Sequence, residues 1–205
     1  DSCPICTLPI PLSVKEHAVV SYCCMKMICD GCYFAAQEKG MKGCPFCRTP
    51  LPDKDAYVLA MIQARVKKKD PVAIEFLGDV YRQGQHGVQK DMQKSVNLYT
   101  EAAELGSISA LYTLGLMHGN GEGVRQDEAK GAEFYKKAAM QGHAESRHKL
   151  GCYEGLKGNY DRAVKHCLIS AKMGLQSSTG LIKQLFVMGL ATKEQYAEAL
   201  KGFQD

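Results

Sequence analysis

The sequence of 205 residues contains no tryptophan, no strong excess of either charge and no long apolar run. Because no stretch of 18 consecutive residues is apolar, we expect no membrane-spanning helix. The formal net charge of +4 gives by itself little reason to expect nucleic-acid binding. With 45% hydrophobic and 23% charged residues, the composition is that of a globular protein rather than a disordered one.

Motifs of several enzyme classes are also missing from the sequence. It contains no hydrolase elbow, no metalloprotease helix and no dinucleotide fingerprint. The glycine-rich stretch 119–123 lacks the Lys-Ser/Thr pair of a phosphate loop, so we expect a turn between helices there. The histidines beyond residue 80 are scattered and show no metal-ligand spacing. These absences argue against an enzyme in the C-terminal part of the chain.

Cysteine, in contrast, is abundant and concentrated at one end. Eight of the ten cysteines lie in the first 47 residues, and only Cys152 and Cys167 lie beyond them. We expect these two to pack as small apolar core residues. The chain begins with Asp1 rather than methionine, so we expect a fragment or a processed product, in which a targeting segment upstream would not be visible.

The eight N-terminal cysteines form three C-x-x-C pairs and one adjacent doublet. A C-x-x-C turn directs two sulfurs at one point, which suits a tetrahedral zinc ion with Zn–S distances of about 2.3 Å. Eight sulfurs suffice for two such sites, so we predict two Zn²⁺ ions per chain. A disulfide framework is the alternative, but regular C-x-x-C pairs favour metal. The order of the pairs is Cys3 and Cys6, Cys23 and Cys24, Cys29 and Cys32, and Cys44 and Cys47.

This order of cysteines over residues 3–48 resembles a RING-type zinc finger. The resemblance implies an interleaved cross-brace in which the first and third pairs hold one zinc ion. Those ligands are Cys3, Cys6, Cys29 and Cys32. The second ion is then held by Cys44 and Cys47, with two further ligands from the region of Cys23 and Cys24. In a domain this small, the metal supplies most of the folding energy.

The second site departs from the RING pattern at one position. Counting back from Cys29, Cys24 stands in the usual cysteine position, but Lys26 stands where the family has a histidine. A protonated lysine has no lone pair to donate to a metal. Three alternatives remain: Cys23 and Cys24 both bind, His17 supplies the missing ligand, or the site is three-coordinate or empty. We favour the doublet, which completes a set of eight sulfurs.

The RING resemblance also implies a groove that recruits a ubiquitin-conjugating enzyme. The matching positions are Ile5 between the first two ligands, Pro45 after the seventh ligand and Arg48 after the eighth. The arginine would clamp the charged carrier through its planar, bidentate donor group. The helix residue that is usually bulky falls near Ala35 or Ala36, and the chain has no tryptophan to offer there. Structural roles compete at each position: Ile5 as a core plug, Pro45 as a knuckle residue and Arg48 as a surface charge.

A linker is predicted over residues 51–70. Pro50 and Pro52 break regular structure, and the apolar spacing that follows predicts a helix over 55–69, capped by Asp55. The helix ends in a basic cluster that consists of Arg65, Lys67, Lys68 and Lys69. We expect a solvated helix end there, with a nuclear-localisation signal as the alternative.

Residues 71–205 repeat with a period near 36. Leu77-Gly78 recurs as Leu114-Gly115 and as Leu150-Gly151, a period typical of helix-pair solenoids. We expect each of these glycines to admit a closely packed partner helix, and Asp91 and Asp127 to cap the second helices.

These residues resemble the Sel-one-like repeat, a relative of the tetratricopeptide repeat. The resemblance implies about four units, at 71–106, 107–142, 143–174 and a degenerate 175–205. A capping box that starts at Thr192 is predicted to open the last helix.

We therefore predict a small zinc-stabilised, RING-like cross-brace domain followed by an all-α helical-repeat solenoid. The predicted domains are a zinc finger over 1–50, a linker helix over 51–70 and repeats over 71–205. The resemblance implies a RING-type ubiquitin ligase or ligase subunit whose repeats bind a protein substrate. In that case the head has no catalytic nucleophile and acts by positioning the carrier. The alternative is a non-catalytic adaptor. Reduced cysteines favour the cytoplasm or nucleus.

Overall fold

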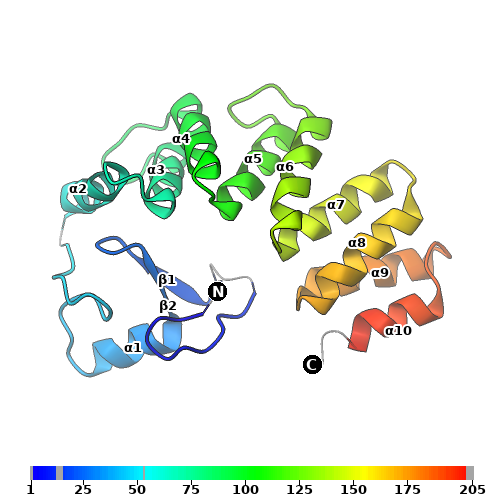
Figure 1. Cartoon of the computed structure of the whole chain (residues 1–205), viewed down its shortest axis with the longest axis horizontal. Helices are drawn as coiled ribbons and strands as arrows, with labels where there is room; N and C mark the ends of the chain where they lie inside the picture. The colour runs from blue at the N-terminus through cyan, green and yellow to red at the C-terminus, as the bar shows by residue number, and fades with distance from the viewer. Residues whose placement is uncertain (1, 13–15, 53, 202–205) are drawn as a thin grey trace. The chain divides into compact units, whose positions relative to one another are not determined.

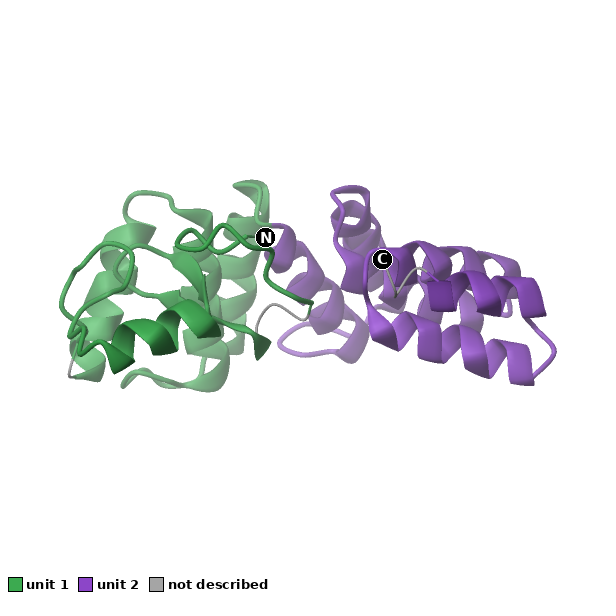
Figure 2. Cartoon of the chain, turned by 90° about the horizontal axis from the view of Figure 1, so that it is seen from below, with its two compact units in different colours: residues 1–107 green, residues 108–205 purple. Residues whose placement is uncertain are grey.

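The computed structural model describes residues 2–12, 16–52 and 54–201. Contacts within the chain define two compact units, residues 1–107 and 108–205, which Figure 2 shows in different colours. The first unit holds the cysteine-rich head together with three of the helices that follow it. The predicted domain boundaries at residues 50 and 70 remain predictions. None of the helices in the described ranges combines the length and apolar character needed to cross a membrane.

The head is built from a short hairpin, one helix and two loops (Figure 1). Strands β1 (Ala18–Ser21) and β2 (Lys26–Cys29) pair antiparallel, with Val19 opposite Ile28. Helix α1 (Asp30–Glu38) follows β2 directly. The apolar core is small: Ile10 and Ile28 are buried among cysteines. Hydrophobic packing alone therefore gives this part of the chain little stability.

Helix α2 (Asp55–Val66) ends three residues before the predicted position. A closing turn follows, in which Lys69 takes a left-handed φ of 54° and the Asp70 amide donates to the Arg65 carbonyl at 3.3 Å. This pairing satisfies a carbonyl that the helix end leaves without a partner. The side chain of Asp70 then caps α3 (Pro71–Gln83) by accepting a hydrogen bond from the Val72 amide at 3.1 Å.

The prediction that Asp55 caps α2 is wrong. Lys54 occupies the N-cap position, and its side chain makes no capping hydrogen bond. Asp55 lies in the first turn instead, where its Oδ1 atom is 2.8 Å from Nδ1 of His86. The Asp55 carboxylate thus contacts His86, 31 residues away in the sequence, instead of capping its own helix.

The remaining helices follow one another in pairs along the chain (Figure 1). Each repeat contributes one pair, joined by a turn that contains glycine or asparagine. The predicted all-α repeat architecture is therefore confirmed. After α3, the helices are α4 (Met92–Glu104), α5 (Ile108–Asn120), α6 (Glu128–Met140), α7 (Ala144–Leu156), α8 (Tyr160–Lys172), α9 (Gln176–Val187) and α10 (Lys193–Lys201).

Side chains cap several of these helices as the sequence predicts. Asp91 accepts a hydrogen bond from the Lys94 amide at 2.9 Å, and Asp127 accepts one from the Lys130 amide at 2.9 Å. At the start of α10, Gln195 and Thr192 exchange hydrogen bonds of 2.8 and 3.2 Å, which is the predicted capping box. Each cap satisfies amides that the first helical turn leaves without partners.

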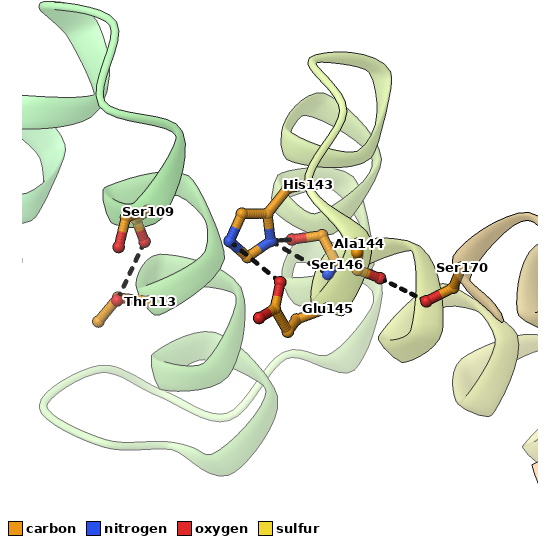
Figure 3. Close-up of polar contacts among 7 residues, drawn as sticks. All are labelled: Ser109, Thr113, His143, Ala144, Glu145, Ser146 and Ser170. Carbon is orange, nitrogen blue, oxygen red and sulfur yellow. Dashed lines mark hydrogen bonds and ion pairs between the residues drawn. The ribbon is translucent and has the colours of Figure 1, made fainter. Parts of the chain in front are cut away.

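Polar contacts also join helices within the second unit (Figure 3). His143 precedes α7 and accepts at Nδ1 from the Ser146 amide, at 3.2 Å. Its ring centroid lies 5.0 Å from that of Tyr112 on α5. Ser170 on α8 donates its hydroxyl to the Ala144 carbonyl at 2.8 Å. This histidine therefore serves as a helix cap and a packing surface.

Two of the three Leu-Gly pairs bring a helix close to a buried tyrosine of its partner helix, whereas a Cβ atom added to Gly151 of the third pair would lie 2.5 Å from Sγ of Cys167. A Cβ atom added to Gly78 would lie 3.2 Å from the ring of Tyr99, and one added to Gly115 would lie 2.5 Å from the ring of Tyr135. Burial raises the pKa of both tyrosines, so both stay neutral. The absence of a side chain at these glycines is what permits the contact.

We expect Gly115→Ala to destabilise the protein, because the added methyl group must displace the Tyr135 ring. Overpacking of this kind costs about 1–3 kcal/mol, which outweighs the better helix propensity of alanine. Urea unfolding monitored by circular dichroism measures the change. Gly119→Ala on the same helix is the matched control, because no atom lies within 4 Å of its added Cβ. A stability of Gly115→Ala equal to that of Gly119→Ala would contradict the close-packing account.

Candidate metal centres

Two loops of the head have the same local structure. In each, a hydrogen bond closes a Cys-Pro-x-Cys segment. The amide of the residue that follows the second cysteine donates to the carbonyl of the first. Thr7 donates to the Cys3 carbonyl at 2.9 Å, and Arg48 donates to the Cys44 carbonyl at 2.9 Å. Both donors have a left-handed backbone, with φ of 63° at Thr7 and 65° at Arg48. We call these loops the first knuckle (Cys3 to Thr7) and the second knuckle (Cys44 to Arg48). Each directs two cysteine sulfurs toward one point.

The first knuckle contributes to a group of four sulfurs. Its partners are Cys29, which precedes α1, and Cys32, which lies in the first turn of α1. The Sγ atoms of Cys3, Cys6, Cys29 and Cys32 all lie within 4.8 Å of one another. The Sγ atoms of Cys6 and Cys29 are 3.8 Å apart, about the edge length of a tetrahedron with Zn–S bonds of 2.3 Å.

The second knuckle contributes to a second group of four. It meets the turn between β1 and β2, so that Cys23, Cys24, Cys44 and Cys47 also lie within 4.8 Å of one another. The Sγ–Sγ distance is 3.9 Å between Cys24 and Cys44 and 3.2 Å between Cys23 and Cys47. The first cysteine pair of the sequence thus meets the third, and the second meets the fourth. This is the interleaving that the RING resemblance implies.

His17, the alternative ligand of the second site, and Lys26, which stands in the family's histidine position, both lie outside the two groups. Lys26 is exposed at the start of β2, and His17 is exposed just before β1. An adjacent cysteine doublet needs an unusual backbone, and the chain provides it at Met25, where φ is 54°. The Ser21 carbonyl accepts hydrogen bonds from the amides of Cys24 and Met25, at 3.2 and 2.7 Å. These bonds turn the chain so that both sulfurs face the second knuckle.

All ten cysteines of the chain are free thiols. Cys167 is fully buried, as predicted for a core residue. Cys152 is only partly buried, and its Sγ atom lies 3.5 Å from Nε2 of His148. The core prediction was thus wrong for Cys152, because its position on α7 leaves one side of the thiol uncovered.

The thiols of each group influence one another electrostatically. Burial opposes ionisation of Cys3, but hydrogen bonds from the amides of Cys6, Cys29 and Ile5 lower its pKa to about 6. For Cys32, burial and then the sulfurs of Cys29, Cys6 and Cys3 raise the pKa to about 12. One thiol of the group therefore ionises readily and holds back the ionisation of a neighbour.

The second group shows the same contrast. Burial opposes ionisation of Cys47, but hydrogen bonding with Thr49 lowers its pKa to about 6. Burial raises the pKa of Cys24 to about 11, and the charge on Cys44 adds to the effect. Four sulfurs held this close repel one another once several are ionised. A divalent cation between them attracts each thiolate and so outweighs that repulsion. Two tetrads of this kind can each hold one zinc ion, since a tetrahedral sulfur set suits zinc.

The three positions predicted to bind a conjugating enzyme lie at the surface of the knuckles. Ile5 is 42% exposed, so it does not plug the core beside the first group. Pro45 is partly buried in the second knuckle. Arg48 is exposed, and its Nη1 atom donates to the Met41 sulfur at 3.1 Å. These residues are available to a partner, but their role in binding stays a prediction.

Three further apolar side chains of the head, Leu8, Phe34 and Phe46, are exposed, and the sequence analysis did not single them out. Leu8 is 65% exposed after the first knuckle, and Phe34 is 58% exposed on α1. Of the two positions considered for a bulky groove residue, Ala35 is exposed and Ala36 is buried. Phe34 precedes them directly, so α1 does present a large ring to solvent. Sequence pattern alone could not show this, because α1 is too short to reveal which of its faces is buried.

Comparison with known proteins identifies the repeats. The family model described as Sel1 repeat matches residues 71–107, 108–143 and 144–175. The match leaves the cysteine-rich head outside it, so the RING resemblance remains a prediction. Helices α9 and α10 form a further pair beyond the matched residues, at the place predicted for a degenerate unit. No curated protein gives a significant match to the chain.

Two solved structures share the repeat fold. A Sel1 repeat protein from Oxalobacter formigenes is 24% identical, with a TM-score of 0.64 over 71% of this chain. A protective antigen of uropathogenic Escherichia coli with an SLR fold is 30% identical, with a TM-score of 0.63 over 70% of this chain. The alignments span 61% and 33% of the lengths of those two proteins. Because the matched repeats cover more than half of its residues, the chain belongs to the Sel1 repeat family.

Proposed function

We propose that each cysteine tetrad holds one Zn²⁺ ion and that the ions stabilise the head. The proposal is supported by eight free thiols gathered in two groups, each within 4.8 Å, and by a small core whose buried residues other than cysteine are Ile10 and Ile28. Structural zinc sites contribute about 10–16 kcal/mol in model peptides, far more than so small an apolar core can supply. The residues that would hold the ions are the eight cysteines named above.

We further propose that the protein is an adaptor that binds other proteins through both of its parts. Sel1 repeat proteins mediate protein–protein interactions, and three such repeats make up residues 71–175. This match is the observation that carries the proposal. The zinc head adds a second rigid surface, on which Ile5, Leu8 and Phe34 are exposed. These apolar side chains are accessible to a protein partner.

A RING-type ubiquitin ligase is the second candidate function. It is favoured by the interleaving of the tetrads and by the exposure of Ile5 and Arg48 on the two matching knuckles. In this case the head binds a charged ubiquitin-conjugating enzyme, and Arg48 restrains the reactive conformation by hydrogen bonding. The repeats then bind the protein that receives ubiquitin.

Removal of zinc tests the first proposal. When a strong chelator is added, we expect amides of β1 and β2 to lose protection from hydrogen exchange, because the tetrads no longer brace the hairpin. Amides in α5–α8 keep their protection, because apolar packing holds those helices together. Hydrogen exchange followed by mass spectrometry makes the measurement. Cys47→Ser should reproduce the loss in the head without chelator, whereas Cys152→Ser, outside the tetrads, should not. Unchanged protection of the hairpin in chelator would refute the metal role.

A ubiquitination assay separates the two functions. The adaptor proposal predicts that the purified chain builds no ubiquitin conjugates with any enzyme of a broad conjugating panel. Conjugation that falls at least tenfold in both Ile5→Ala and Arg48→Ala would replace the adaptor with the ligase. Leu156→Ala and Arg125→Ala, at exposed positions of the repeats, are the matched controls. Each should behave as the unmodified chain does.

A further inference from the structure

The turn that carries Cys23 and Cys24 is not surrounded by solvent but packs on the linker helix α2 and on α3, the first helix of the repeats. Met25, the next residue, is only 6% exposed and lies in one apolar cluster with Val58 and Ile62 of α2 and Leu77 of α3. The ring of Tyr22 lies 5.2 Å from the ring of Phe76 on α3. The hairpin tip thus has one face toward the second tetrad and the other in the core of α2 and α3.

A hydrogen bond ties the same turn to the end of α2. Nε of Arg65 donates to the carbonyl oxygen of Cys23 at 3.1 Å. The Arg65 side chain also lies 3.9 Å from the carboxylate of Asp70, the residue that caps α3. Arg65 therefore connects a metal-binding turn to both helices. The three lysines that complete the basic cluster, Lys67, Lys68 and Lys69, are exposed.

The backbone of the turn needs such support. Met25 adopts a left-handed φ of 54°, which is unfavourable for a residue with a long side chain. Conformations of this kind persist where the surroundings hold them in place. Here the buried Met25 side chain fixes one end of the doublet, and the hydrogen bond to the Cys23 carbonyl fixes the other. Cysteines of both tetrads pack with Ile10 and Ile28 of the head. Among the described residues, only the turn of the second tetrad is also joined to α2 and α3, through Met25 and the Cys23 carbonyl.

We propose that Arg65 and Met25 are positioning residues for the second metal site, so that helices α2 and α3 are part of its supporting structure. They hold the Cys23–Cys24 turn in the geometry that directs both sulfurs at the second knuckle. The metal affinity of the second site then depends on the packing of α2 and α3, and that of the first site does not. This inference rests on the proposal that the tetrads hold zinc.

Coupling of this kind is reciprocal. If α2 and α3 raise the affinity of the second site, metal in that site must stabilise α2 and α3 by the same free energy. A bound ion in the head thereby makes the first repeat more rigid. In this way the zinc head and the start of the protein-binding arm act as one body within the first unit.

Substitution of Arg65 tests the inference on the full, metal-loaded chain. The protein is exchanged with ¹¹³Cd, which gives a separate NMR signal for each tetrad, and the second signal is assigned by its loss in Cys47→Ser. We expect Arg65→Ala to lose the ion of the second site at least tenfold more readily to a competing chelator, because it removes a charge-assisted hydrogen bond. The first signal should behave as in the unmodified chain. Lys68→Ala, which removes an exposed charge from the same cluster, is the matched control.

The outcomes separate this inference from the proposed function. A chain that binds neither zinc nor cadmium refutes the metal proposal. If the unmodified chain binds two ions, and Arg65→Ala loses both at the same chelator concentrations as the unmodified chain, the inference is refuted and the metal proposal stands.

A second measurement does not depend on the folding of the arginine variant. In Cys47→Ser, we expect faster hydrogen exchange in α2 and α3, whereas Cys6→Ser should leave both helices unchanged. Equal exchange of these helices in the two variants would also overturn the inference.

Discussion

The close approach of four thiol sulfurs at each of two points is the constraint on which the head depends. The sulfurs come from the two knuckles, the hairpin and the start of α1, and these elements bring them together. Sulfurs at such distances repel one another when ionised, and burial and then the neighbouring sulfurs raise the pKa values of Cys24 and Cys32. The arrangement is stable when a cation lies between the sulfurs. Ile5 and Arg48 are exposed on the knuckles, so their positions depend on the geometry of the tetrads.

The repeat arm follows a different physical principle. Its helices are held by apolar packing, by caps such as Asp91 and Asp127, and by glycines that admit the rings of Tyr99 and Tyr135. No ion is needed for these contacts. The two principles meet at the hairpin tip, where Met25 belongs to the turn of a cysteine tetrad and also to the core of α2 and α3. The cysteine-rich head thus packs directly on α2 and α3 rather than being connected to them by a free linker.

Local patterns predicted much of this structure from the sequence. The period near 36 predicted the helix pairs, because it compares whole units along the sequence. The residue types at Asp91, Asp127 and Thr192 predicted their caps, because a cap acts within the first turn of its own helix. The spacing of the cysteines, together with the RING resemblance, predicted which sulfurs meet. Whether these sulfurs bind zinc, and whether Ile5, Pro45 and Arg48 bind a partner, remain predictions.

The failures of the sequence analysis involve contacts between residues distant in the sequence. Asp55 pairs with His86 instead of capping its own helix, and Arg65 binds the Cys23 carbonyl instead of ending in solvent with the neighbouring lysines. Neither partner can be read from local spacing. The exposure of Phe34 and the incomplete burial of Cys152 likewise depend on which helix faces are covered.

Native mass spectrometry of the purified, untreated chain is the most direct test of the central claim that metal braces the head. The account predicts a folded species with two zinc ions per chain, which loses both in acid to give the mass of a chain with ten free thiols. A folded species without metal, lighter by two hydrogens for each cysteine pair in the head, would contradict it.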